Sequence, residues 1–274
     1  MTTPRQRWLL LTTMACAAVL VWTRDTSWLT NIADTLPLAA GIPLAWWLGG
    51  PWKPRNAIDL NGRQKALAAA ICGFVIGWLI SNLSLLAISW TLLTGCLVAA
   101  TYQPRLGRLR LAWLLLLSFP WIALEWPQTG WWFRLSSAWA AEHFFNLLAM
   151  PVVREGTHLN VMGVPIDIEP SCAGWNLLQI TLLTGVTLGS HELPSPRRFS
   201  VLLCLLPALS WCANLFRILL LSGLALSFDV DVANGVLHGL TGLGVIAVLV
   251  IMTKTLCILL TPNRHRHSVI ISKS

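Results

Sequence analysis

The sequence has few charged residues. Asp, Glu, Lys and Arg make up 11% of its 274 residues, whereas a soluble domain averages roughly 25%. Hydrophobic residues make up 55%, and apolar runs of about 20 residues recur along the whole length. This pattern excludes a soluble domain with a single anchor. Because lipid forces each segment to pair its own backbone polar groups, we predict an all-α polytopic membrane protein.

The chain also lacks the motifs of several catalytic and metal-binding classes. It has no Cys-x-x-Cys pair, which argues against a disulfide oxidoreductase or a zinc site. It has no His-Glu-x-x-His motif, and Asp34 is alone in its apolar run, so neither a metalloprotease nor an aspartate-pair protease is indicated. We therefore expect no metal and no organic cofactor. Six of the seven cysteines lie within apolar runs, where they act as small hydrophobic residues: Cys16, Cys72, Cys96, Cys204, Cys212 and Cys257.

About eight membrane spans can be predicted from the apolar runs. The first resembles a signal peptide but lacks a small-x-small cleavage site, so we expect it to be retained. The third and fourth spans are separated only at Asn82, which predicts a tight helical hairpin. The predicted spans are Trp8–Trp22, Ile32–Gly49, Ala66–Ser81, Leu83–Ala100, Leu111–Leu124, Cys172–Ser190, Phe199–Phe228 and Val236–Leu260.

The basic residues predict the orientation. With eight spans and the N-terminus inside, 15 of the 19 Lys and Arg residues fall in cytoplasmic segments, as the positive-inside bias requires. Both termini are then cytoplasmic. Although the formal net charge is +8, its dispersal over short loops argues against nucleic acid as a partner. The outside segments hold only Arg24, Arg134 and Arg154.

One long extracytoplasmic segment separates two helical halves. Its first part, Leu135–Met150, has the spacing of an amphipathic helix lying along the membrane surface. Its second part, Val152–Glu169, alternates in places and includes turn-forming residues, which predicts a β-hairpin-like arm. The predicted organisation is an N-terminal helical half (1–124), the extracytoplasmic segment (125–171), a catalytic helical half (172–260) and a basic cytoplasmic tail (261–274).

Cys172 is the first candidate for chemistry, because it follows Pro170 and Ser171 at a predicted helix start. A thiol in the first turn feels the positive end of the helix dipole, which favours the nucleophilic thiolate. Gly174 would leave space beside the sulfur, and Asn176 lies one turn further on the same face. The simpler alternative is a structural cysteine at an interface.

Arg217 is the second candidate. An arginine within an apolar span costs about 2.5–3.5 kcal/mol to insert and is a functional candidate for that reason. It lies roughly 27 Å along the helix from the cytoplasmic end at Phe199, near the outer boundary of a core about 30 Å thick. Asn214 lies three residues earlier on the same face. The alternative is an arginine that reaches lipid head groups.

His238 begins the last predicted span, so it too belongs near the outer surface. Neighbouring glycines, such as Gly239 and Gly242, would let this helix approach the seventh span closely. The alternative is an interfacial histidine bonded to a loop. Glu169 is a further polar residue at the end of the arm. If the predicted topology holds, a thiol, a permanent cation and an imidazole converge at the outer membrane surface.

These residues resemble the exosortase/archaeosortase family of membrane cysteine transpeptidases. The resemblance rests on four elements in order: Met150–Gly156, Cys172-Ala173-Gly174, Asn214-x-x-Arg217 and His238. It covers roughly Leu135 to His238. Many members have Cys-Ser-Gly followed by an aliphatic residue, whereas this chain has Ala173 and Trp175, a difference that bears on the subfamily and its recognition motif.

The resemblance implies a function in protein sorting at a bacterial or archaeal cytoplasmic membrane. Family members process proteins that carry a C-terminal sorting tail, composed of a short motif, a transmembrane helix and a basic cluster. By this resemblance Cys172 is the nucleophile and Arg217 and His238 complete the triad, with the site facing outward. The expected partners are tail-bearing membrane-anchored substrates and membrane lipid. The rival hypothesis is a non-enzymatic transporter or assembly subunit in which Arg217 binds an anionic substrate or lipid.

Overall fold

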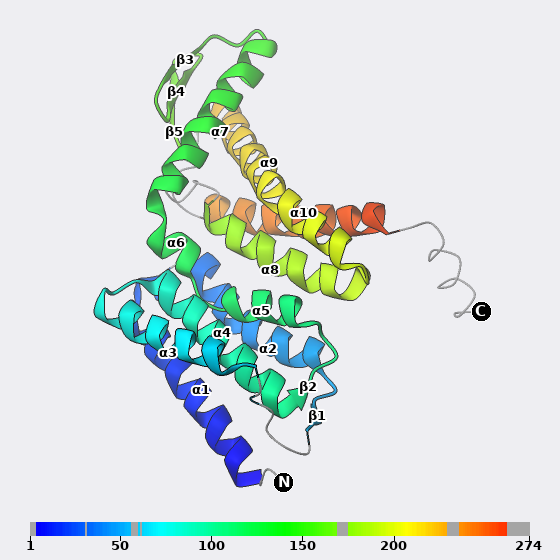
Figure 1. Cartoon of the computed structure of the whole chain (residues 1–274). Helices are drawn as coiled ribbons and strands as arrows, with labels where there is room; N and C mark the ends of the chain where they lie inside the picture. Colours follow the sequence, from blue (N-terminus) through cyan, green and yellow to red (C-terminus); the bar gives the residue numbers. More distant parts are fainter. Residues whose placement is uncertain are drawn as a thin grey trace, which may run out of the picture. The chain divides into compact units, whose positions relative to one another are not determined.

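The structure is a computed structural model, and it describes residues 4–30, 32–55, 60, 62–168, 175–228 and 236–261. The described chain is mostly helical and divides into two compact units, Met1–Glu125 and Trp126–Ser274 (Figure 1). By length and composition, three helices within the described residues could cross a membrane, at Leu83–Thr101, Pro196–Ser227 and Leu240–Leu260. Shorter apolar helices cover Leu9–Arg24, Thr35–Gly49 and Gln64–Leu79.

The described part of the first unit contains helices and two short strands that pair antiparallel. Its helices α1, α2, α3 and α4 correspond to the first four predicted spans. The elements are α1 (Pro4–Arg24), η1 (Ser27–Thr30), α2 (Ile32–Gly49), β1 (Lys53–Pro54), α3 (Gln64–Leu79), α4 (Leu83–Thr101), β2 (Tyr102–Gln103), α5 (Arg108–Leu116) and α6 (Trp121–Glu125).

The turn between α3 and α4 has a well-bonded helix start. The Asn82 side chain accepts a hydrogen bond from the backbone N–H of Leu85 at 2.7 Å, as an N-cap residue does. The carboxylate of Glu125 in turn accepts from the Asn82 amide at 3.0 Å and from the backbone N–H of Leu83. The two helices contact each other after this turn, so the tight hairpin predicted at Asn82 is confirmed.

The fifth predicted span, Leu111–Leu124, is wrong as a single helix. The structure has two short helices, α5 and α6, with a break before Trp121. Pro120 lies at this break, and proline cannot continue a helix because it lacks an N–H and clashes with the preceding turn. The neighbouring Phe119 is fully buried, and its ring packs edge-on to Trp90 of α4 with 5.0 Å between centroids.

The described residues of the second unit form a long helix, a small sheet and three further helices. Its elements are α7 (Pro127–Leu147), β3 (Val152–Glu155), β4 (His158–Val161), β5 (Val164–Asp167), α8 (Trp175–Glu192), α9 (Pro196–Phe228) and α10 (Val236–Leu260). Helices α8, α9 and α10 each contact the other two, and α7 contacts α9 (Figure 1). Helix α7 begins eight residues before the surface helix predicted at Leu135–Met150.

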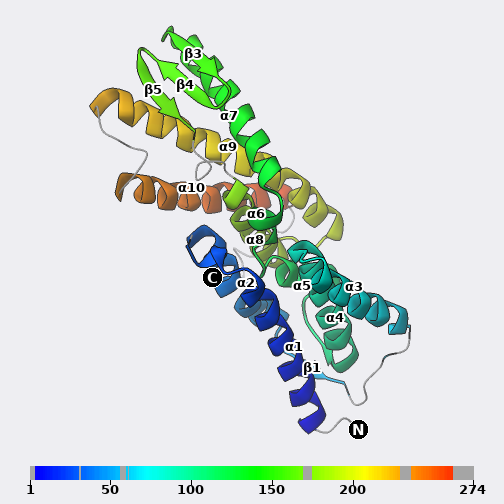
Figure 2. The same ribbon diagram turned by 90° about the vertical axis from the view of Figure 1, so that its left-hand side faces the viewer.

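The predicted hairpin-like arm is a three-stranded antiparallel sheet of order β3-β4-β5 (Figure 2). The sheet packs on α7, where Arg154 of β3 forms an ion pair with Glu142 of α7 at 2.7 Å. Buried side chains of the sheet, α7 and α9 form one hydrophobic cluster: Ala138, Ala141, Phe145, Leu159, Val161, Ile168, Ile218 and Leu221. The strands are therefore packed into a hydrophobic core that they share with α7 and α9.

Candidate functional site

A buried polar face runs along the middle of α9. Ser210 and Asn214 are 0% exposed and Arg217 is 7% exposed. Their spacing of four and three residues places all three on one side of the helix. Leaving a polar group buried and unsatisfied costs roughly 1–3 kcal/mol. Both side-chain atoms of Asn214 are buried with no hydrogen-bond partner among the described residues, so this amide is available to a group that the described chain does not supply.

Helix α10 approaches α9 at Arg217 through a glycine. A Cβ placed on Gly242 would lie 3.7 Å from Nη2 of Arg217, so the guanidinium occupies the space beside this glycine. Gly242 lies four residues after His238, one helical turn along α10. Residues four positions apart share one side of a helix, so by its position His238 belongs to the same side of α10 as Gly242. The side chain of His238 lies outside the described residues.

The start of α8 packs against α9 and α10 close to the polar face of α9. Leu177 of α8, Ala213 of α9, and Val245 and Leu249 of α10 form one buried cluster. Ala213 is adjacent to Asn214, and Leu177 lies five residues after Cys172. Asn176 belongs to the first turn of α8, but its side chain lies outside the described residues. The helix that begins after Cys172 is thus anchored beside the polar face of α9.

The chain that leads toward Cys172 is anchored to α9 as well. Ile168 is 2% exposed and belongs to the cluster that contains Ile218, the residue after Arg217. Its carbonyl accepts a hydrogen bond from Nη1 of Arg134 on α7 at 3.3 Å. Three predicted site residues follow in the segment 169–174, which lies outside the described residues: Glu169, Cys172 and Gly174.

The described residues bring together part of the predicted site. Arg217 and Asn214 lie on one buried face, with Gly242 of α10 beside Arg217 and with both flanks of the segment 169–174 packed near them. A buried guanidinium of this kind can stabilise a developing negative charge, because the surroundings exclude water. Among the described residues, no group of three or more His, Cys, Asp or Glu side chains could hold a metal ion.

Two structural features of this region were not predicted from the sequence. Gly185 and Gly189 of α8 allow close packing on α9, since a Cβ at Gly185 would lie 2.3 Å from Cδ1 of Leu206 and one at Gly189 would lie 2.6 Å from Cδ2 of Leu202. Their four-residue spacing is the small-xxx-small pattern of membrane helix contacts, so the sequence pattern could have predicted this close packing. The bond from Arg134 to the end of the arm had no such signal, because it joins residues 34 positions apart.

Comparison with protein families gives one match. A family model described as transmembrane exosortase (Exosortase_EpsH) matches residues 10–254. The match covers most of both units and every residue of the candidate site. Searches of curated proteins and of solved structures return no match.

Proposed function

Because this chain belongs to the transmembrane exosortase family, and so to a family of multi-pass membrane proteins with a sortase-like transpeptidase role, we propose that it is a membrane-embedded cysteine protease or transpeptidase. Its substrates are exported proteins with a C-terminal sorting tail: a short motif, a transmembrane helix and a basic cluster. Cys172 cuts beside the outer end of that helix and forms a thioester with the upstream part of the substrate.

The burial of Arg217 beside Gly242 of α10 is the observation that carries this proposal. Burying an arginine in a membrane span costs free energy, and charged groups in membrane interiors occur mainly at functional sites. Ile168 and Leu177 flank the segment with Cys172, and both belong to core clusters that include residues of α9 next to the site. Four residues of extended chain reach at most about 14 Å, so the anchor at Ile168 limits how far Cys172 can lie from α9.

The proposed reaction follows from the three groups. The Cys172 thiolate attacks the carbonyl carbon of the scissile peptide bond after His238 accepts the thiol proton. The guanidinium of Arg217 stabilises the oxyanion of the tetrahedral intermediate. When this intermediate collapses, the carbon–nitrogen bond breaks, His238 protonates the leaving amine and a thioester remains. An acceptor amine or water then attacks the thioester carbon while His238 takes its proton; the carbon–sulfur bond breaks, and the proton passes from His238 to the sulfur.

Four other residues have supporting roles in the proposal. Gly174 leaves room for the substrate backbone beside the sulfur. The buried amide of Asn214 hydrogen-bonds the bound peptide or the oxyanion, which would satisfy its two unpaired polar atoms. Asn176 and Glu169 border the same site at the start of α8 and at the end of the arm.

The proposed topology has eight spans with both termini in the cytoplasm and the site facing outward. The distribution of basic residues supports it, and α5 together with α6 would form the fifth crossing. The substrate helix would then lie in lipid beside the chain, with its basic tail on the cytoplasmic side. We place the protein in a bacterial or archaeal cytoplasmic membrane.

Replacement of the nucleophile tests the proposal. Cys172→Ala should abolish processing of a reporter whose C-terminus carries the tail of an exported protein from the same cell. Cys212→Ala is the matched control, because Cys212 is an exposed cysteine of α9. This variant should process the reporter at the wild-type rate. Continued processing by the Cys172→Ala protein would overturn the assignment.

The reactivity of Cys172 separates an enzyme from a transporter or assembly subunit. A membrane-impermeant maleimide added from outside should label an activated Cys172 near pH 7 faster than an ordinary thiol. Arg217→Lys keeps the charge but loses the planar fork, and it should lower processing by about 10²-fold. An unreactive Cys172, together with reporter processing that is the same with and without this protein, would favour the non-enzymatic alternative.

A further inference from the structure

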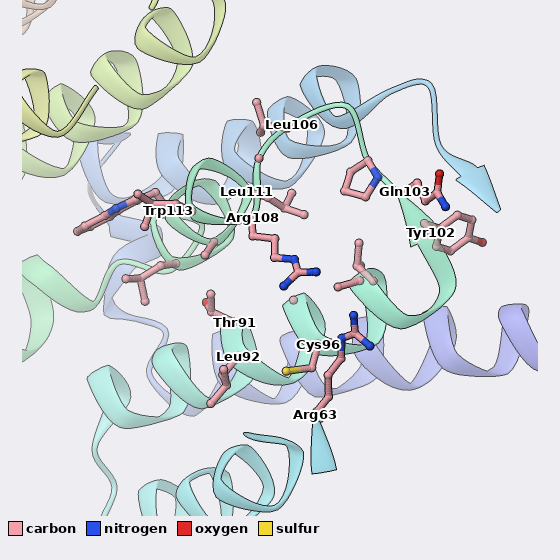
Figure 3. A pocket seen from close by; sticks show the side chains of 18 of the residues that line it. Arg63, Thr91, Leu92, Cys96, Tyr102, Gln103, Leu106, Arg108, Leu111 and Trp113 are labelled. Atoms are coloured by element: carbon pink, nitrogen blue, oxygen red, sulfur yellow. The ribbon is translucent and has the colours of Figure 1, made fainter. Parts of the chain in front are cut away.

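The first unit contains a cavity that the proposed reaction does not use. It has a volume of about 770 Å³ and lies between α4, β2 and α5 (Figure 3). Drug-sized ligands occupy pockets of roughly 300–1,000 Å³, so this space admits a sizeable molecule. Its walls are mainly apolar side chains of α4 and α5, among them Leu92, Val98 and Leu111.

One end of this cavity is strongly basic. The described lining includes four arginines, Arg55, Arg63, Arg105 and Arg108, and no acidic residue. Figure 3 shows the guanidinium groups of Arg63 and Arg108 directed into the same space above Cys96. Four cations around one opening attract an anion and repel a basic segment. The basic cluster of a substrate tail is therefore the wrong chemistry for this cavity.

The other end of the cavity has the dimensions of one membrane leaflet. Its lining follows α4 from Ala99 back to Ile88, a distance of about 17 Å along the helix. The hydrocarbon part of one leaflet is about 15 Å thick. Ile88, Leu92 and Leu109 are 50%, 39% and 52% exposed, so apolar side chains line the route from the basic end toward the middle of the span.

We propose that this cavity binds one anionic phospholipid of the surrounding membrane. The phosphate lies between Arg63 and Arg108, and an acyl chain follows the apolar wall of α4 past Leu92. In the proposed topology the basic end faces the cytoplasm, where anionic head groups are recognised by basic pockets between membrane helices. A soluble anion would leave the apolar wall empty, and an uncharged lipid would make no use of the positive charge at the opening.

Gly95 allows the cavity to be filled without disturbing the fold. It lines the space, and a Cβ at this position would meet no atom within 4 Å. Gly95→Leu should therefore enter the volume assigned to the acyl chain. Gly244→Leu is the matched control, because the same is true of Gly244 on α10, which is outside the cavity. Arg108→Gln removes charge at the opening, and Arg197→Gln at the start of α9 is its control.

The test measures binding of dioleoyl phosphatidylglycerol to the full-length protein in neutral detergent, by native mass spectrometry and by the shift in Tm. Gly95→Leu and Arg108→Gln should each weaken binding by about tenfold or more, and both controls should bind as the wild type does. Dioleoyl phosphatidylcholine should bind at least tenfold more weakly, and glycerol phosphate should not compete.

Three results would overturn the proposal: equal binding by all four variants, equal binding of the two lipids, or full competition by glycerol phosphate. If Arg108→Gln does not fold, Gly95→Leu with its control decides alone. The proposal is independent of the reaction assigned to Cys172, because lipid binding is measured without substrate.

Discussion

The contact between α10 and Arg217 gives a graded test of the site. A Cβ at residue 242 would lie 3.7 Å from Nη2 of Arg217, which is an ordinary van der Waals distance. Gly242→Ala should therefore leave the guanidinium in place and processing within about twofold of the wild type. Any larger side chain must compete with the guanidinium for space.

Leucine and phenylalanine extend at least two carbon–carbon bonds of about 1.5 Å each beyond Cβ. Helical side chains have few allowed rotamers at χ1, and in this place the extra atoms push the guanidinium aside by at least about 1 Å. A displacement of about 1 Å at a catalytic group can cost 10²-fold in rate. We expect a loss of roughly that size in Gly242→Leu and a larger loss in Gly242→Phe.

The assay follows cleavage of the tail-bearing reporter in membranes that contain equal amounts of each variant. Gly244→Leu and Gly244→Phe are the controls, because a Cβ at Gly244 meets no atom within 4 Å. If Gly242→Phe cleaves as fast as Gly244→Phe, the guanidinium of Arg217 is not needed beside the His238 turn. The role given to this arginine would then be refuted.

Two further predictions concern stability. Gly185→Leu should lower the stability of the purified protein by about 1–3 kcal/mol, because a Cβ there would already lie 2.3 Å from Leu206 of α9. Gly223→Leu is the control and should not lower it, because a Cβ at Gly223 would meet no atom within 4 Å. Equal Tm values for the two variants would show that α8 and α9 are not closely packed. The hydrogen bond from Lys254 holds the pKa of Glu192 below its ordinary value of 4.5, so its stabilising effect is fully present above that value and is lost as the pH falls through the lowered pKa. Glu192→Gln should therefore weaken the dependence of Tm on pH below about 4.5, and an unchanged acid limb would contradict the pairing.

Apolar runs were sufficient to predict most of the helices. The bounds of α2 agree with the second predicted span, and α3, α4, α8, α9 and α10 begin and end within three residues of the predicted ones. The prediction of a single fifth helix was wrong because hydropathy reflects only how apolar the residues are and does not detect the break at Pro120. The number of membrane crossings stays a prediction, since three helices within the described residues have the length and composition of a span.

The small sheet shows what local pattern could not give. Alternation in Val152–Glu169 predicted extended chain, but the third strand and its packing on α7 depend on contacts with residues far away in the sequence. The ion pair of Arg154 with Glu142 and the bond from Arg134 to the carbonyl of Ile168 are examples, because neither partner's position is set by its neighbours.

The candidate site was predictable where a residue was out of place in its surroundings. An arginine within an apolar run marked Arg217, and the structure buries it on the α9 face that carries Asn214. Cys172 and the side chain of His238 lie outside the described residues, so their positions and catalytic roles stay predictions from sequence and family.

Trapping the acyl-enzyme tests the central claim most directly. The protein is incubated with its tail-bearing substrate, quenched in acid, digested and examined by mass spectrometry. The account predicts the upstream part of the substrate attached to Cys172 through a bond that hydroxylamine cleaves, with the adduct missing in Cys172→Ala and reduced in Arg217→Lys. A substrate adduct on another residue, or cleavage in the Cys172→Ala protein, would contradict it.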